Sequence, residues 1–522
     1  MRIATAGPGP GVFSSPIRWV ASGIPFAVAG AITILVATKV SSPSIELAIG
    51  IPVGIGTAVW MFVSQRMERP LIVFLLYLGL LDGYLKLATD SSAITLGRDA
   101  LLYAILLGFL ARAVLRRQPL ALPPLSGWIL AFTAVAIIQL INPESHGFVH
   151  KLGALRPHLE FVPLFFIGYY MVQTPARLRT FFLIMLLIAT ANGVVGAIQL
   201  ELTPSQLAAW GPGYKYRILG TGSGVNQVSG RTFTTSTGEQ ETRPFGLGDD
   251  AGVGAAWGML ALSGVFALAS LGFRRGYYGA VAMLLCIGPP LAIITGEGRG
   301  YLIASVVVLL AYAALATTPR RLVPTMLALI LGLGAIVGVV AFVASSSGSS
   351  VFSRYATVTP GKLISTTGTD RGGSYDAIPK LITRHPLGTG LGSVGPAATF
   401  AGGGKTSAAN GETQMGYLLS ELGIPGLIVF YGLNAYLLYL GLTRLRRLDP
   451  ETRTYIAALL ASLIGLLALG LTSATSATSP EAPYFWFAAG ALSYWLITAL
   501  GPGRARGQRA AIATDAVTPT SA

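Results

Sequence analysis

Charged residues are scarce in this chain. They make up 11% of its 522 residues, whereas 52% are hydrophobic, and the mean hydropathy is +0.65. An ordinary soluble domain carries about 25% charged residues. The composition therefore excludes the soluble globular class and indicates that the lipid bilayer is the main solvent.

Cysteine and histidine are also nearly absent. The one cysteine, Cys286, lies inside an apolar run, and only four histidines occur. One thiol excludes an intrachain disulfide framework and a cysteine metal site. The histidines are too scattered for a zinc motif, so we expect no metal and no cofactor.

Acids are scarcer than bases, with 21 Asp and Glu against 36 Lys and Arg and a net charge of +15. A basic balance can indicate nucleic-acid binding. However, no basic helix or aromatic-basic array lies outside the apolar segments, so we expect no nucleic acid. Anionic lipids or phosphates are the expected partners.

Apolar runs of about 20 residues are long enough to cross a bilayer, and about fourteen can be counted with some shorter or tilted. The sequence thus predicts an all-α integral membrane protein. The run from Leu71 to Leu87 is interrupted by Asp82 and Lys86. The expected spans begin near Val20, Ile45, Leu71, Asp99, Gly127, Leu159, Arg179, Ala251, Tyr277, Gly300, Leu322, Thr413, Thr454 and Ala482.

The connections fix an orientation, because short cytoplasmic loops are rich in Lys and Arg. With the N-terminus inside, every inner loop is basic, and we expect a multi-pass plasma (inner) membrane protein with both termini cytoplasmic. We expect a cytoplasmic segment over 1–18, a transmembrane domain over 19–503 and a disordered tail over 504–522. The inner-loop arginines are Arg66, Arg69, Arg112, Arg116, Arg117, Arg177, Arg179, Arg274, Arg275, Arg320, Arg321, Arg444, Arg446, Arg447 and Arg453.

Two outer loops, about 201–250 and about 345–412, are much longer than the others, and long loops translocate whatever their charge. The second loop contains a pattern typical of a short helix, Ser374 to Arg384, with one apolar face. That face consists of Tyr375, Ile378, Leu381 and Ile382. Lys380 and Arg384 are four residues apart on another face.

Arg299 is the sharpest anomaly, because the short outer loop Thr295 to Gly300 should avoid arginine. One interpretation is an interfacial arginine that reaches lipid headgroups. The other is an anion site, in which the guanidinium and the N-terminus of the next helix hold a phosphate.

Three other basic positions map to the same side of the membrane. Arg243 begins Arg-Pro-Phe-Gly-Leu-Gly-Asp-Asp250, Arg371 lies in Asp370-Arg-Gly-Gly-Ser374, and Arg384 precedes His385. Each could be a loop charge, and Arg243 could pair with Asp249 or Asp250. Their common side favours a shared role.

Acids on that side are candidate bases. Glu412 precedes a span, so it is either a helix-start acid favoured by the macrodipole or a general base at the mouth of the bundle. Glu160 and Asp99 should face the bundle interior, and Arg156 can pair with Glu160 four residues later. For Glu160, Asp99 and Arg156 we favour a structural role over a catalytic one.

Four of these segments, in order, resemble the O-antigen ligase and Wzy-type polysaccharide polymerase superfamily. They are Arg243-Pro-Phe-Gly246 before a span, Gly296-Glu-Gly-Arg-Gly300, the stretch from Arg371 through His385-Pro-Leu-Gly-Thr-Gly-Leu-Gly392, and the block Glu412 to Gly426. Residues 152–170 resemble the exopolysaccharide members more weakly. Glu412 and Thr413 stand where the ligase branch has His-Asn, which favours a polymerase.

The resemblance implies a GT-C-like fold and metal-independent, inverting transfer of a glycan from an undecaprenyl pyrophosphate carrier to an acceptor hydroxyl at the outer face. Arg243, Arg299 and Arg371 would hold pyrophosphate and Glu412 would be the base. Substrate contacts are expected from Lys380, Arg384, His385, Arg217, Arg156 and Gln414. Membrane lipids and other envelope polysaccharide assembly proteins are the further partners.

Three alternatives stay open. The first is an O-antigen-type ligase that transfers finished glycan to a lipid or protein. The second is a lipid-linked oligosaccharide flippase or transporter, which predicts charges deep inside several spans and Pro or Gly breaks in helices. The third, a non-catalytic envelope scaffold, gives no reason for Arg299.

Overall fold

The computed structural model describes residues 43–117, 122–144, 147–220, 232–234, 240–272, 277–317, 373–395 and 412–501. Within these ranges the chain is mainly helical, as the apolar runs predict. The N-terminal helices are α2 (Pro43–Val63), α3 (Glu68–Leu80), α4 (Asp82–Thr89), α5 (Ser92–Leu115), α6 (Ser126–Ile138), α7 (Phe148–Leu159), α8 (Pro163–Met171), α9 (Pro175–Leu200), α10 (Pro204–Ala208) and α11 (Pro212–Leu219). The later helices are α12 (Val253–Ser270), α13 (Tyr277–Leu285), α14 (Gly288–Thr295), α15 (Arg299–Ala316), one over residues 373–384, α18 (Gln414–Arg444), α19 (Pro450–Leu469) and α20 (Glu481–Ser493). Strands β1 (Thr232–Thr234) and β2 (Gln240–Thr242) form an antiparallel pair.

Six of the described helices are long and apolar enough to cross a membrane, or seven if the bent pair of α3 and α4 is one span. Every expected span position within the described residues carries a helix. The one expected near Asp99 begins earlier, at Ser92, where Ser91 accepts a hydrogen bond from Ala93 N–H and so caps the helix. The spans expected near Val20 and Leu322 and the two terminal segments lie outside the described residues. So do 221–231 and 235–239 of the first long loop and about 345–372 and 396–411 of the second.

The interruption at Asp82 is a bend. The axes of α3 and α4 differ by 47°, and both Asp82 and Lys86 are buried on α4. A charge buried among apolar helices needs partners. The bend therefore turns these two side chains toward the bundle, where other charges meet them.

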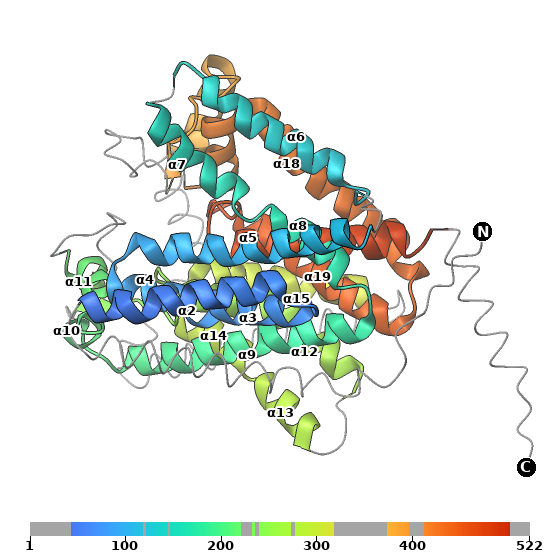
Figure 1. Ribbon diagram of the computed structural model, residues 1–522, viewed down its shortest axis with the longest axis horizontal. Coiled ribbons are helices and arrows are strands. Elements are labelled where there is room, and N and C mark those ends of the chain that lie inside the picture. The colour runs from blue at the N-terminus through green and yellow to red at the C-terminus, as the bar shows by residue number, and fades with distance from the viewer. Residues whose placement is uncertain are drawn as a thin grey trace, which may run out of the picture.

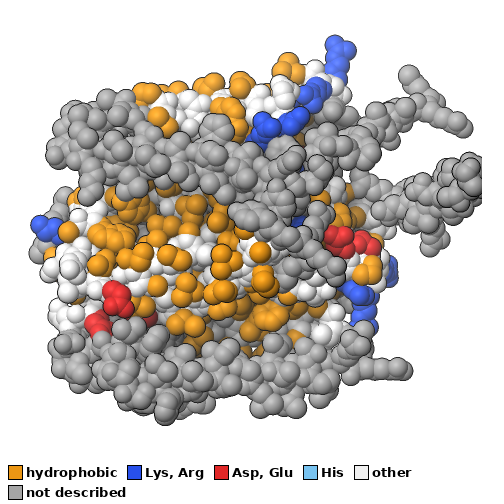
Figure 2. Space-filling view, turned by 90° about the horizontal axis from the view of Figure 1, so that it is seen from below, with side chains coloured by type: hydrophobic (Ala, Val, Ile, Leu, Met, Phe, Trp, Pro, Cys, Tyr) orange, Lys and Arg blue, Asp and Glu red, His pale blue; other side chains and the backbone are white. Residues whose placement is uncertain are grey.

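Helices α3, α5, α9 and α12 run side by side, whereas α6 and α18 form an inclined pair next to them (Figure 1). Small residues bring some helices into backbone contact: a Cβ added at Gly490 of α20 would lie 1.9 Å from Phe165 O of α8. Apolar side chains gather over the middle of the face in Figure 2, and charged ones lie toward its left and right ends. This banding is typical of a helical membrane protein.

Three of the expected inner-loop arginines lie at one end of the bundle, which we call the arginine-rich end, whereas residues 273–276 and 318–321 lie outside the described residues. There Arg177 pairs with Glu68, Arg112 donates to Phe62 O at 2.7 Å, and Arg444 donates to Leu496 O at 3.1 Å. The opposite end, which we call the loop end, carries α4, α10 and α11, at the left of Figure 1. These three arginines thus lie at one end of the described bundle, and the short helices α10 and α11 lie at the other.

Candidate functional site

The segment from Arg243 to Asp250 is held tightly at the loop end. Gln199 of α9 accepts hydrogen bonds from Phe245 N–H and Gly246 N–H, both at 2.8 Å. Gly246 has φ +65, and a Cβ there would lie 2.8 Å from Asn192 Oδ1, so this position favours glycine. Two buried amides of α9 thereby fix the turn that carries Arg243 into α12, and Arg243 itself is half-buried.

Arg299 is the first residue of α15, directly after the N-cap Gly298. A Cβ at Gly296 would lie 2.7 Å from Ala255 Cβ, so the Gly-rich turn packs against the start of α12. The Arg299 side chain is half-buried. Within the described part of the chain its buried Nε has no hydrogen-bond partner. The guanidinium therefore has donor capacity to offer at a helix N-terminus.

Tyr301 connects these two turns to α20. Its hydroxyl donates to Glu481 Oε1 at 2.8 Å, and Arg243 and Asp250 both lie within electrostatic range of it. Glu481 is buried at the start of α20. Residues from the starts of α12, α15 and α20 therefore meet around one tyrosine.

Gln414 reaches the same region through residues 470–476. Gln414 N–H donates to Gly470 O at 2.8 Å, and its side chain donates to Ser476 Oγ at 2.6 Å. The start of α15 contacts this turn as well, because a Cβ at Gly300 would lie 3.2 Å from Thr472 Oγ1. Glu412 is half-buried and stands one residue before the N-cap Thr413. The structure thus brings Arg243, Arg299 and Gln414 to neighbouring turns.

Other expected substrate residues are exposed, contact other partners or lie outside the described residues. Lys380 and Arg384 are exposed on the helix over 373–384. His385 Nδ1 lies 2.8 Å from Glu144 Oε2. Arg371 lies outside the described residues.

The apolar face expected for that helix is only partly correct. Leu381 is buried, whereas Tyr375 and Ile382 are exposed. Tyr375 instead donates its hydroxyl to Leu471 O at 2.5 Å. The helix therefore contacts the 470–476 turn mainly through a polar group.

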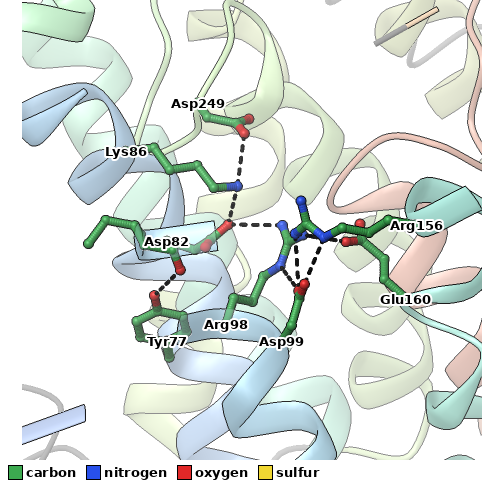
Figure 3. Close-up of polar contacts among 9 residues, drawn as sticks. Tyr77, Asp82, Lys86, Arg98, Asp99, Arg156, Glu160 and Asp249 are labelled. Atoms are coloured by element: carbon green, nitrogen blue, oxygen red, sulfur yellow. Dashed lines mark hydrogen bonds and ion pairs between the residues drawn. The ribbon is translucent and has the colours of Figure 1, made fainter. Parts of the chain in front are cut away.

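A network of buried charges extends from Arg156 to Asp249 (Figure 3). Arg156 contacts Asp99 at 2.7 Å and, as the sequence predicts, Glu160 at 3.0 Å. Glu160 contacts Arg98 at 2.8 Å. Three of these residues come from α5 and α7, and they face the bundle interior. Arg156, which the sequence analysis assigns to substrate binding, thus takes part in this network.

The network continues to the Arg243 segment. Arg98 lies 3.4 Å from Asp82, and Lys86 bridges Asp82 at 2.8 Å and Asp249 at 3.1 Å. Arg217 of α11 lies 3.6 Å from Asp250. Both acids of this segment therefore contact cations on other helices.

The charges around Asp249 alter its protonation. Burial acts to raise the pKa of this carboxyl, but the positive charges of Lys86 and Arg217 and the hydrogen bond from Lys86 outweigh burial. Its pKa is therefore lowered from the ordinary 3.8. Asp249 stays ionised and keeps the segment joined to α4.

A second polar cluster was missed by the sequence analysis. His158 Nε2 of α7 lies 2.8 Å from Glu421 Oε2 of α18, and both side chains are fully buried. Glu421 Oε1 accepts hydrogen bonds from Gly392 N–H at 3.2 Å and Val394 N–H at 3.4 Å. This cluster fastens the segment after His385 to α18. The sequence signal that could have indicated this cluster is an acid and a histidine within apolar helices, where such groups need partners.

The segment after His385 also supplies hydrogen-bond partners at a break in α18. Gly423 has φ +66, which interrupts the helical hydrogen bonds. Thr389 N–H then donates to Ser420 O at 2.7 Å, and Ile424 N–H donates to Pro386 O at 2.8 Å. Irregular backbone buried in a membrane protein must be satisfied in this way.

Among the described residues, no group of three or more His, Cys, Asp or Glu side chains is arranged to hold a metal ion. In comparisons with known proteins, no family model matches the chain and no curated protein is significantly similar to it.

Proposed function

We propose that the chain is a GT-C-like membrane glycosyltransferase that polymerises undecaprenyl pyrophosphate-linked repeat units into a cell-surface polysaccharide. The observation that carries the proposal is the Arg299 turn. A half-buried arginine, whose Nε has no hydrogen-bond partner among the described residues, begins a helix beside the Arg243 segment. Planar guanidinium groups and a helix N-terminus suit a pyrophosphate.

In the proposed reaction the acceptor hydroxyl oxygen attacks the anomeric carbon of the donor from the side opposite the pyrophosphate. The new glycosidic bond forms as the bond to the pyrophosphate oxygen breaks, which inverts the configuration. Glu412 takes the hydroxyl proton. Arg243, Arg299 and Arg371 stabilise the negative charge that develops on the leaving group, so that no metal is required in this scheme.

Incubation of purified protein with lipid-linked repeat units tests the proposal. We expect longer lipid-linked chains that still form in EDTA and are lost in Arg299→Ala and Glu412→Gln. Arg447→Gln, which changes an exposed arginine on the α18 to α19 connection, is the matched control and should polymerise normally. Growth that persists in both site variants would overturn the assignment.

The same assay distinguishes a polymerase from a ligase. A ligase transfers a finished glycan once to a lipid or protein acceptor, so the products would not form a ladder of increasing length. The substitution of Glu412-Thr413 for the His-Asn pair of the ligase branch favours the polymerase.

A flippase is the second candidate, and two observations favour it. Charges on α4 and α5 are buried, and Gly423 breaks α18, as a transporter would require. Movement of fluorescent lipid-linked substrate across liposomes without new glycosidic bonds would favour this function over the polymerase.

A further inference from the structure

An apolar groove opens near the arginine-rich end, far from the proposed glycosyl transfer. It lies between α3, α8, α9 and α20, and the space in and around it that protein atoms do not fill is about 710 Å³, open solvent included. Its walls include Leu71 and Leu75 of α3 and Phe181 and Ile184 of α9. The groove is therefore shaped by four helices that pack at the bundle surface.

One charged pair stands at the mouth of this groove. Glu68 and Arg177 both line it, and they contact each other with side chains 28% and 27% exposed. Arg66, Arg69 and Arg179 flank this pair in sequence. The two chain segments that supply the pair thus carry four arginines and one carboxylate, so their net charge is positive.

The groove follows the helices away from these charges. From Glu68 to Leu75, and equally from Arg177 to Ile184, seven residues of helix rise about 10 Å. This is about a third of a hydrocarbon core of roughly 30 Å. The dimensions suit the part of an acyl chain nearest to its headgroup.

We propose that this groove binds one anionic phospholipid, with an acyl chain between α3 and α9 and the phosphate on Arg177. Basic pockets between transmembrane helices bind acidic headgroups through the same chemistry. In this arrangement the phosphate competes with Glu68 for the guanidinium. The lipid thereby links α3 to α9 when it is bound.

The competition gives two variants with opposite expected effects. Arg177→Gln removes the phosphate partner, and we expect about tenfold weaker retention of phosphatidylglycerol, a change of about 1.4 kcal/mol. Glu68→Gln removes the competing carboxylate, so retention should rise. Both variants break the same ion pair, and a loss of folding would therefore act in the same direction in both.

The measurement is native mass spectrometry of the full chain with phosphatidylglycerol and phosphatidylethanolamine of identical acyl chains. We expect preferential retention of phosphatidylglycerol, and its loss in Ala176→Trp, which fills the groove from an exposed position. Arg447→Gln and the exposed Leu130→Trp are the matched controls and should retain the lipid.

Equal retention of both lipids would overturn the proposal. A change in the same direction in Arg177→Gln and Glu68→Gln would overturn it too. These readouts do not involve glycosyl transfer, so their outcome is independent of the proposed polymerase.

Discussion

Replacement of Glu421 tests how the segment over 386–395 is held. In Glu421→Ala the N–H groups of Gly392 and Val394 and the ring of His158 lose their common acceptor while they remain inside the bundle. A buried donor without a partner costs about 1–3 kcal/mol. Glu421→Gln keeps an oxygen that can accept from both backbone groups.

The expected loss of stability follows from the partners of Glu421. Removal of one member of a buried pair costs about 3–5 kcal/mol, and we expect Glu421→Ala to destabilise the protein by this amount. Glu421→Gln loses the charge but not the acceptor, so about 1–2 kcal/mol is expected. His158→Ala should resemble Glu421→Ala, because it leaves the carboxylate buried without its ring partner.

Tryptophan fluorescence of the detergent-solubilised protein during denaturant unfolding measures these differences. Thiol labelling of Ser393→Cys in a Cys286→Ala background reports the local release of the segment. Glu451→Gln, an exposed acid on α19, is the control and should change neither readout. Equal stabilities of Glu421→Ala and Glu421→Gln would refute the reasoning, because the acceptor would then contribute nothing.

Three further predictions concern the bundle. Lys86→Met leaves Asp82 buried without its nearest cation and should cost about 3–5 kcal/mol by the same unfolding assay. The pKa of Asp249 is lowered in the folded protein, so the contribution of its carboxylate to the free energy of unfolding is complete above pH 3.8. This contribution is lost as the pH falls through the lower pKa of the folded state. Asp249→Asn should therefore reduce the pH dependence of the free energy of unfolding in this range. Gly490→Val should separate α8 from α20, since even a Cβ would lie 1.9 Å from Phe165 O, and should lower the yield of monodisperse protein.

Apolar length was sufficient to predict the long helices of the described residues. The pairing of Arg156 with Glu160 also follows from helical spacing and is confirmed. Long-range partners were not predictable in this way. Lys86 and Asp249 are separated by 163 positions, and only the bend between α3 and α4 brings them together. Local patterns contain no information about such a bend.

In the candidate site, too, single residues were predictable from the sequence but their long-range contacts were not. The sequence indicated Arg243, Arg299 and Gln414 individually, but the turn over 470–476 that joins them contains only small hydroxylated and apolar residues. His158 and Glu421 were each visible in the sequence. Their contact spans 263 positions, so no spacing rule connects them.

The hydrogen bonds around the break in α18 also constrain the order in which the chain folds during synthesis. Gln139, at the end of α6, donates to Leu387 O across 248 positions, so the ribosome makes the donor long before its acceptor. Hydrocarbon offers no water as a substitute partner. The junction of α6 with α18 is therefore closed late during biosynthesis, and a nascent chain that ends before Ile424 cannot complete it.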